Sequence, residues 1–149
     1  MVITKRKGGI KMEKKIDEKK LLNEAKEARK NAYVPFSGFT VGAALLTKDG
    51  KIYRGCNIES SVMSPSLCAE RVALAKAISE GEKDFLAIAI VGAPKDEDPK
   101  DPCYPCGVCR QALSEHVDLS TFKIITEENG KPSTCTLSDL LPKAFIFEK

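Results

Sequence analysis

The residues best suited to chemistry are cysteines at two predicted helix starts. Cys68 precedes one segment with helically spaced apolar residues, and Cys106 and Cys109 open another. A thiolate at the N-terminus of a helix is stabilised by the free backbone N–H groups and by the helix dipole. Cys106 and Cys109 are three residues apart, so they share one face of the first helical turn. If the two helix starts face each other across the top of a sheet, three thiolates meet there.

Three protein ligands and one open position are typical of a catalytic zinc site, whereas a structural zinc site has four ligands. Glu70 follows Cys68 by two residues, too close to be an obvious fourth ligand but well placed beside the open position. The segments Cys68-Ala69-Glu70 and Pro105-Cys106-Gly107-Val108-Cys109 together form the pattern of zinc-dependent nucleobase deaminases. In that chemistry the metal activates a water molecule, and the glutamate transfers protons.

From Tyr33 to Phe145, the chain resembles the cytidine deaminase family of the small, homotetrameric, zinc-dependent type. Beyond the two metal segments, the likeness covers residues 35–44, 55–59 and 140–145. The resemblance implies hydrolytic deamination of cytidine and deoxycytidine to uridine and deoxyuridine, with release of ammonia, in pyrimidine salvage. It also implies a homotetramer whose active sites are shared between subunits.

The resemblance assigns roles to ten residues. They are Cys68, Cys106 and Cys109 for Zn²⁺, Glu70 for catalysis, Phe36, Asn57, Glu59, Ala69 and Phe145 for the substrate, and Arg71 as donor to the cysteine sulfurs. In these roles the amide and carboxylate of Asn57 and Glu59 hold the ribose hydroxyls, and the ring of Phe36 packs on the pyrimidine. Phe145 reaches the site of a neighbouring subunit.

One stretch departs from the family pattern. Where the family usually has Asn-Ala and then an aromatic residue, this chain has Ser60-Ser61-Val62-Met63. The departure keeps a second substrate class open, a modified cytosine nucleoside or a nucleoside antibiotic such as blasticidin S. The blasticidin-S enzymes lack the ribose-binding glutamate, however, and Glu59 is present here.

Other interpretations of the cysteines exist. The spacing of Cys103, Cys106 and Cys109 resembles the start of an iron–sulfur run, but no fourth cysteine follows until Cys135. A non-catalytic, structural zinc module with Cys103 as fourth ligand leaves Glu70 without a purpose. We expect Cys103 to be a loop thiol.

The elements that must position these residues alternate along the chain. Helices are expected from a cap at Asp17 to residue 32, from a cap at Ser64 or Ser66 to residue 81, over 106–117 and over 138–142. Strands are expected over 39–47, 51–58, 85–91, 122–126 and 133–136. This order predicts an α/β fold, a three-layer α/β/α sandwich with a mixed five-stranded sheet.

The composition is that of one globular domain. The chain has 149 residues, 42% hydrophobic and 30% charged, enough for a core without disulfides. Basic residues gather in the first 30 positions, and the rest is mildly acidic. We expect a flexible basic tail over residues 1–15 and a single catalytic domain over 16–149.

Composition also argues against several functions. An acidic body with 6% aromatic residues and no Trp disfavours a nucleic-acid partner. No apolar run approaches the ~20 residues of a membrane span, so no membrane partner is expected. Six cysteines without a secretory signal favour a cytoplasmic protein and a metal or catalytic role. The one histidine, His116, excludes sites that need two imidazoles, and we expect no catalytic role for it.

Overall fold

A computed structural model describes residues 2–6, 9–13 and 15–149. At the N-terminal end, β1 (Val2–Arg6) pairs antiparallel with β2 (Gly9–Glu13) in a two-stranded sheet of its own. The flexible tail expected over residues 1–15 falls partly on positions 1, 7–8 and 14, which lie outside the described residues. That expectation stays a prediction.

The main sheet has five strands in the order β4-β3-β5-β6-β7. The strands are β3 (Phe39–Thr47), β4 (Ile52–Cys56), β5 (Phe85–Pro94), β6 (Lys123–Glu128) and β7 (Lys131–Thr136). Strand β3 is antiparallel to both of its neighbours, the central strand β5 runs parallel to β6, and β6 and β7 are antiparallel. The prediction of a mixed five-stranded sheet is confirmed.

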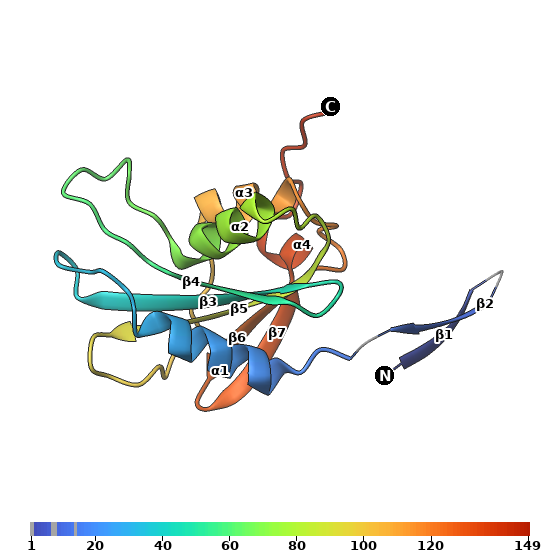
Figure 1. The fold of residues 1–149 in the computed structure, drawn as a ribbon, viewed down its shortest axis with the longest axis horizontal. Coiled ribbons are helices and arrows are strands. Elements are labelled where there is room, and N and C mark those ends of the chain that lie inside the picture. Colours follow the sequence, from blue (N-terminus) through green and yellow to red (C-terminus); the bar gives the residue numbers. More distant parts are fainter. Residues whose placement is uncertain (1, 7–8, 14) are drawn as a thin grey trace.

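Helices cover both faces of this sheet (Figure 1). The first face carries α1 (Glu18–Arg29), and the other carries α2 (Ala69–Ser79), α3 (Gly107–Ser114) and the short α4 (Leu137–Leu140). The predicted three-layer α/β/α architecture is therefore confirmed. None of the helices in the described ranges has the length and apolar character needed to cross a membrane.

Alternation along the central strands builds a core on each side of the sheet. On β5, Ile88 and Ile90 pack on the side of α2 and α3, whereas Ala87 and Ala89 pack on the side of α1. Small residues on the α1 side allow close packing of the helix. A Cβ atom at Gly42 would lie 2.0 Å from the backbone oxygen of Ala25 in α1, so only glycine fits there.

Several helix boundaries differ from the predicted ones; α1, for example, ends at residue 29 and not at 32. Cys68, and neither Ser64 nor Ser66, is the N-cap of α2, because Leu67 still pairs with Ile58 as extended backbone. Helix α3 ends at residue 114, before the predicted 117. Helix α4 begins at residue 137, where a Thr136–Asp139 capping box satisfies the first turn. The Asp17 cap of α1 is confirmed by a 3.0 Å hydrogen bond from the Lys20 backbone N–H.

Candidate active site and metal centre

The starts of α2 and α3 bring three cysteine sulfurs together. Cys68 is the N-cap of α2, Cys106 is the N-cap of α3, and Cys109 lies in the first turn of α3. The three sulfur atoms lie within 4.8 Å of one another, with Cys68 Sγ and Cys106 Sγ 4.0 Å apart. Sulfurs around a tetrahedral Zn²⁺ with Zn–S bonds of about 2.3 Å are separated by roughly 3.8 Å, so the arrangement fits this metal.

A glycine sets the position of the first turn of α2. A Cβ atom at Gly55 on β4 would lie 2.2 Å from the backbone oxygen of Ala69 and 2.5 Å from the backbone nitrogen of Ala73. The absence of a side chain at Gly55 therefore lets the helix start lie directly on the strand. This contact places Cys68 and Glu70, on either side of Ala69, at the edge of the sheet.

Hydrogen bonds among the three clustered cysteines favour the thiolate form of Cys68, the form that binds a metal. The hydrogen bond from the Cys109 thiol, together with Arg71 and Cys106, lowers the pKa of Cys68 to about 5, although burial opposes the shift. The same hydrogen bond and burial raise the pKa of Cys109. A cation bound by all three sulfurs replaces the remaining protons, since thiolates are the ligating form.

Arg71 supplies positive charge beside the sulfurs. Its Nη2 lies 4.0 Å from Cys68 Sγ and donates to the backbone oxygen of Ser66 at 3.1 Å. Its buried Nε has no hydrogen-bond partner among the described residues. The hydrogen bond to Cys68, and then the one to Cys109, raises the pKa of the guanidinium. The role of Arg71 as donor to the sulfurs stays a prediction.

Glu70 is a buried carboxyl in the first turn of α2. Only 5% of its surface is exposed, and burial raises the pKa of the carboxyl above its ordinary value. A carboxyl whose pKa is raised binds a proton more readily than an ordinary one, which suits general acid–base chemistry. Glu70 lines the same cavity as Cys68 and Cys106.

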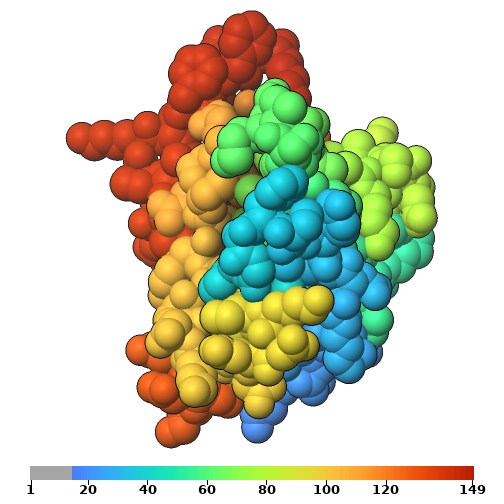
Figure 2. All heavy atoms as spheres, turned by 90° about the vertical axis from the view of Figure 1, so that its left-hand side faces the viewer, coloured from blue at the N-terminus to red at the C-terminus, as the bar shows by residue number. Residues whose placement is uncertain are grey.

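A cavity of about 260 Å³ unites the metal centre with the predicted substrate residues. Its lining comes from β3 and from residues 57–59, 66–70 and 103–106, and consists of Val41, Asn57, Ile58, Glu59, Ser66, Leu67, Cys68, Ala69, Glu70, Cys103, Tyr104 and Cys106. Figure 2 shows the surface of this side of the molecule, where the green segment near residue 60, the cyan one near residue 40 and the orange one near residue 105 come together. The lining combines thiols, two carboxyl groups and an amide with apolar wall residues.

Asn57 and Glu59 follow β4 and enter the cavity lining. The Asn57 side chain ties this segment to β3: its Oδ1 accepts from the Val41 N–H at 2.8 Å, and its Nδ2 donates to the Phe39 oxygen at 2.9 Å. One N–H and one oxygen lone pair of the amide remain for a ligand. The expected strand over 51–58 ends at Cys56 instead, and isolated bridges from Ile58 to Tyr33 and Leu67 hold the segment.

Two predicted substrate residues lie outside this cavity lining. Phe36 and Phe145 are 63% and 69% exposed, and neither lines the cavity. Residues 60–63 lie outside the lining as well, with Met63 85% exposed. Their roles, like those of Asn57, Glu59 and Ala69, stay predictions for the assembled enzyme.

Six residues of the lining were given no site role from the sequence, namely Val41, Ile58, Ser66, Leu67, Cys103 and Tyr104. Cys103 lines the cavity, but it is not part of the three-cysteine cluster. Tyr104 also lines the cavity. Only its position, two residues before a metal ligand, could have pointed to it.

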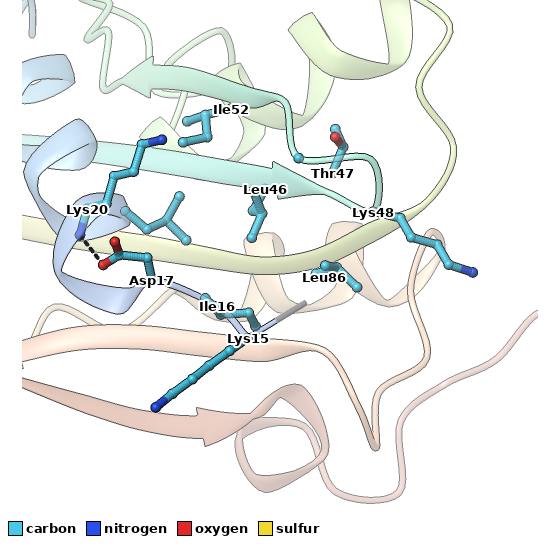
Figure 3. A pocket seen from close by; sticks show the side chains of 11 residues that line it. Lys15, Ile16, Asp17, Lys20, Leu46, Thr47, Lys48, Ile52 and Leu86 are labelled. Atoms are coloured by element: carbon cyan, nitrogen blue, oxygen red, sulfur yellow. Dashed lines mark hydrogen bonds between the residues drawn. The ribbon is translucent and has the colours of Figure 1, made fainter. Parts of the chain in front are cut away.

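A second cavity, of about 200 Å³, lies beside the start of α1 (Figure 3). Ile16, Leu21, Leu46, Ile52 and Leu86 form its apolar lining, and its carboxylate, Asp17, is held by the Lys20 backbone N–H. The lining has no cysteine, histidine or glutamate, so it offers no catalytic group comparable to those of the first cavity.

Comparison with known proteins agrees with this geometry. Residues 15–125 match the family described as the cytidine and deoxycytidylate deaminase zinc-binding region. A cytidine deaminase from Sporosarcina psychrophila is 47% identical over 133 residues, which cover 89% of this chain and 94% of the relative. The crystal structure of a cytidine deaminase from Burkholderia pseudomallei superposes with a TM-score of 0.78 at 40% identity, covering 87% of this chain and all of that one. A blasticidin-S deaminase from Bacillus cereus is 36% identical over 105 residues, 68% of this chain and 74% of the relative.

Proposed function

This chain belongs to the cytidine deaminase family, and we propose on that premise that it hydrolyses cytidine and deoxycytidine to uridine and deoxyuridine with release of ammonia. The observation that carries the proposal is a cluster of three cysteine sulfurs, two of which, Cys68 and Cys106, line one cavity together with the buried Glu70. The predicted zinc cofactor is supported by the three-cysteine cluster and by the match to the family's zinc-binding region.

The reaction needs two proton transfers, and Glu70 is placed to make both. Cys68, Cys106 and Cys109 would hold Zn²⁺, which when bound would supply Lewis-acid activation of a water molecule near neutral pH. Glu70 accepts one proton from the attacking water and delivers it to N3 of the cytosine ring, which makes C4 electrophilic. The water oxygen bonds to C4. Glu70 then passes the second proton to the exocyclic amine, the C4–N bond breaks, and ammonia leaves.

The remaining lining residues orient the nucleoside. We propose that the ribose hydroxyls form hydrogen bonds with the carboxylate of Glu59 and with the remaining N–H and oxygen lone pair of the Asn57 amide. The backbone of Ala69, at the open start of α2, hydrogen-bonds the edge of the base. Fixed hydrogen-bond partners of this kind reject a ligand that lacks the matching hydroxyls. Free cytosine is therefore expected to be a very poor substrate.

A homotetramer with shared sites completes this proposal. Exposed apolar side chains gather near the cavity mouth and at the C-terminal end, namely Phe36, Ile58, Met63, Leu67, Phe145, Ile146 and Phe147. Exposed apolar surface of this kind is typical of a contact between subunits. Contact with a second copy covers these side chains and gives Phe145 a place in a neighbouring site. A sedimentation mass of one chain together with full activity would contradict this assembly.

The second candidate is deamination of a modified cytosine nucleoside or of blasticidin S. It is supported by the similarity to the Bacillus cereus enzyme and by the unusual residues 60–63. Glu59 favours the ribosides, because its carboxylate lines the cavity and suits sugar hydroxyls. A non-catalytic zinc module, the alternative of another class, gives no reason for the buried carboxyl of Glu70.

An ammonia-release assay separates these candidates. The purified protein is offered cytidine, deoxycytidine, cytosine, cytidine monophosphate and blasticidin S at equal concentrations. We expect the two nucleosides to have the highest kcat/KM. A preference for blasticidin S would support the second candidate, and no ammonia from any compound would support the zinc module.

We further propose that the enzyme acts in the cytoplasm, in pyrimidine salvage. All six cysteines are free thiols, as a reducing compartment maintains them. The assigned substrate is a free nucleoside, and its deamination yields a uracil nucleoside for reuse.

A further inference from the structure

The cavity is lined by one aromatic residue, Tyr104, to which the family resemblance assigns no role. Tyr104 lines the cavity, is 47% exposed, and its hydroxyl forms no hydrogen bond with the described residues. Phe36, the ring assigned to the pyrimidine by resemblance, lies outside the lining. Within one chain, the aromatic surface available to a ligand in the cavity is therefore that of Tyr104.

The backbone on both sides of Tyr104 is held in place. On one side, the Cys103 sulfur packs against the backbone at Gly92, where an added Cβ would lie only 2.8 Å from it. On the other side, Pro105 is buried, and its oxygen accepts a 2.7 Å hydrogen bond from Arg110 Nε. Proline also restricts the residue before it to extended backbone. The backbone that carries Tyr104 is therefore restrained on both sides.

Tyr104 is also close to the metal centre. Tyr104 is two residues before Cys106, so their Cα atoms are at most ~7 Å apart. A nucleoside whose C4 lies at the sulfur cluster must extend through the cavity that Tyr104 lines together with Asn57 and Glu59. A half-exposed ring with a free hydroxyl offers such a ligand both an apolar face and a polar tip.

We propose that Tyr104 is a substrate-binding residue that packs its ring against the bound nucleoside and limits the size of the substituents accepted there. This inference rests on the proposed deaminase function. The ring supplies the contact, so Tyr104→Phe keeps it and Tyr104→Ala removes it. Because the contact is made with the substrate from the start of binding, its loss raises KM more than it lowers kcat.

The test measures KM, kcat, zinc content and the dissociation constant of uridine, the last by calorimetry. For Tyr104→Ala we expect KM for cytidine and the uridine dissociation constant to rise about fivefold to tenfold, while kcat changes less than twofold. Cytidine analogues with bulky substituents should lose less than cytidine does. Tyr104→Phe should behave like the parent. Ile78→Ala, which trims an exposed apolar side chain of α2 outside the cavity, is the matched surface control.

The outcomes separate this inference from the function itself. If the parent deaminates cytidine and Tyr104→Ala shows unchanged KM, unchanged uridine affinity and an unchanged analogue range, Tyr104 does not contact the substrate. An equal loss in Tyr104→Ala and Ile78→Ala, or a fall in zinc content with Tyr104→Ala, would assign the residue a structural role. A parent that releases no ammonia from cytidine overturns the proposed function, and this inference with it.

Discussion

Ser37 fixes the carboxylate of Glu59, 22 residues further along the chain. The Ser37 backbone N–H donates to Glu59 Oε1 at 3.2 Å and to Oε2 at 3.3 Å, and the Ser37 hydroxyl donates to Oε1 at 3.2 Å. The same hydroxyl oxygen accepts the Phe39 N–H at 3.0 Å, so the turn before β3 is tied to the segment after β4. Glu59 is therefore oriented before any ligand arrives, which lowers the entropic cost of binding.

Ser37→Ala tests whether this orientation serves the substrate. The variant loses one hydrogen bond to a carboxylate, worth about 1 kcal/mol at a partly exposed site, so KM for cytidine should rise about fivefold with kcat nearly unchanged. Ser37→Thr restores a hydroxyl and should restore KM. Steady-state kinetics of the three proteins decide the matter. A fall in kcat without a rise in KM, or failure of threonine to rescue, would show that the serine does not act through substrate binding.

The geometry of the metal centre predicts that the four cysteines near the cavity differ in their effect on zinc binding. Cys68→Ala, Cys106→Ala and Cys109→Ala should each lose most of the bound zinc, because each removes one of three ligands. Cys103→Ala should keep its zinc, since this thiol lies outside the cluster. Atomic emission on dialysed protein gives the metal per chain. A Cys103→Ala protein without zinc would favour a closed four-cysteine structural site.

The raised pKa of Tyr53 leads us to expect that the protein becomes less stable at high pH. Burial, followed by the hydrogen bond from its hydroxyl to Glu82 Oε1 at 3.0 Å, raises its pKa from 10.0 to about 12. The unfolded chain loses this proton near pH 10 while the folded protein keeps it, so the free energy of unfolding falls as pH rises from 10 towards 12. Urea unfolding across this range measures the slope. Tyr53→Phe should show a smaller slope, and an equal slope in both proteins would remove Tyr53 as its cause.

The sequence predicted most of the fold because its patterns are local. Alternating and continuous apolar runs mark the strands, and β3 was placed at its observed bounds, 39–47. The start of α2 was misplaced because a long-range contact decides it. Ser66 is a good capping residue, yet the Ile58–Leu67 bridge keeps the backbone extended as far as Cys68. Such a contact leaves no periodic signal.

The same distinction explains the site. Cys68, Glu70, Cys106 and Cys109 stand in short segments whose spacing carries the chemistry, so the sequence identified them together. Tyr104 is a single loop residue, and only folding brings it into the cavity. The hydrogen bonds between Ser37 and Glu59 likewise depend on two turns that meet at the edge of the sheet.

The proposed deamination depends most directly on Glu70. Glu70→Gln keeps the size of the side chain and removes the carboxyl that transfers both protons. The measurement is kcat for cytidine deamination together with zinc per chain in the same preparation. We predict a zinc content equal to that of the parent and a kcat lowered by about three orders of magnitude or more. Near-normal kcat in a zinc-loaded Glu70→Gln protein would contradict the mechanism.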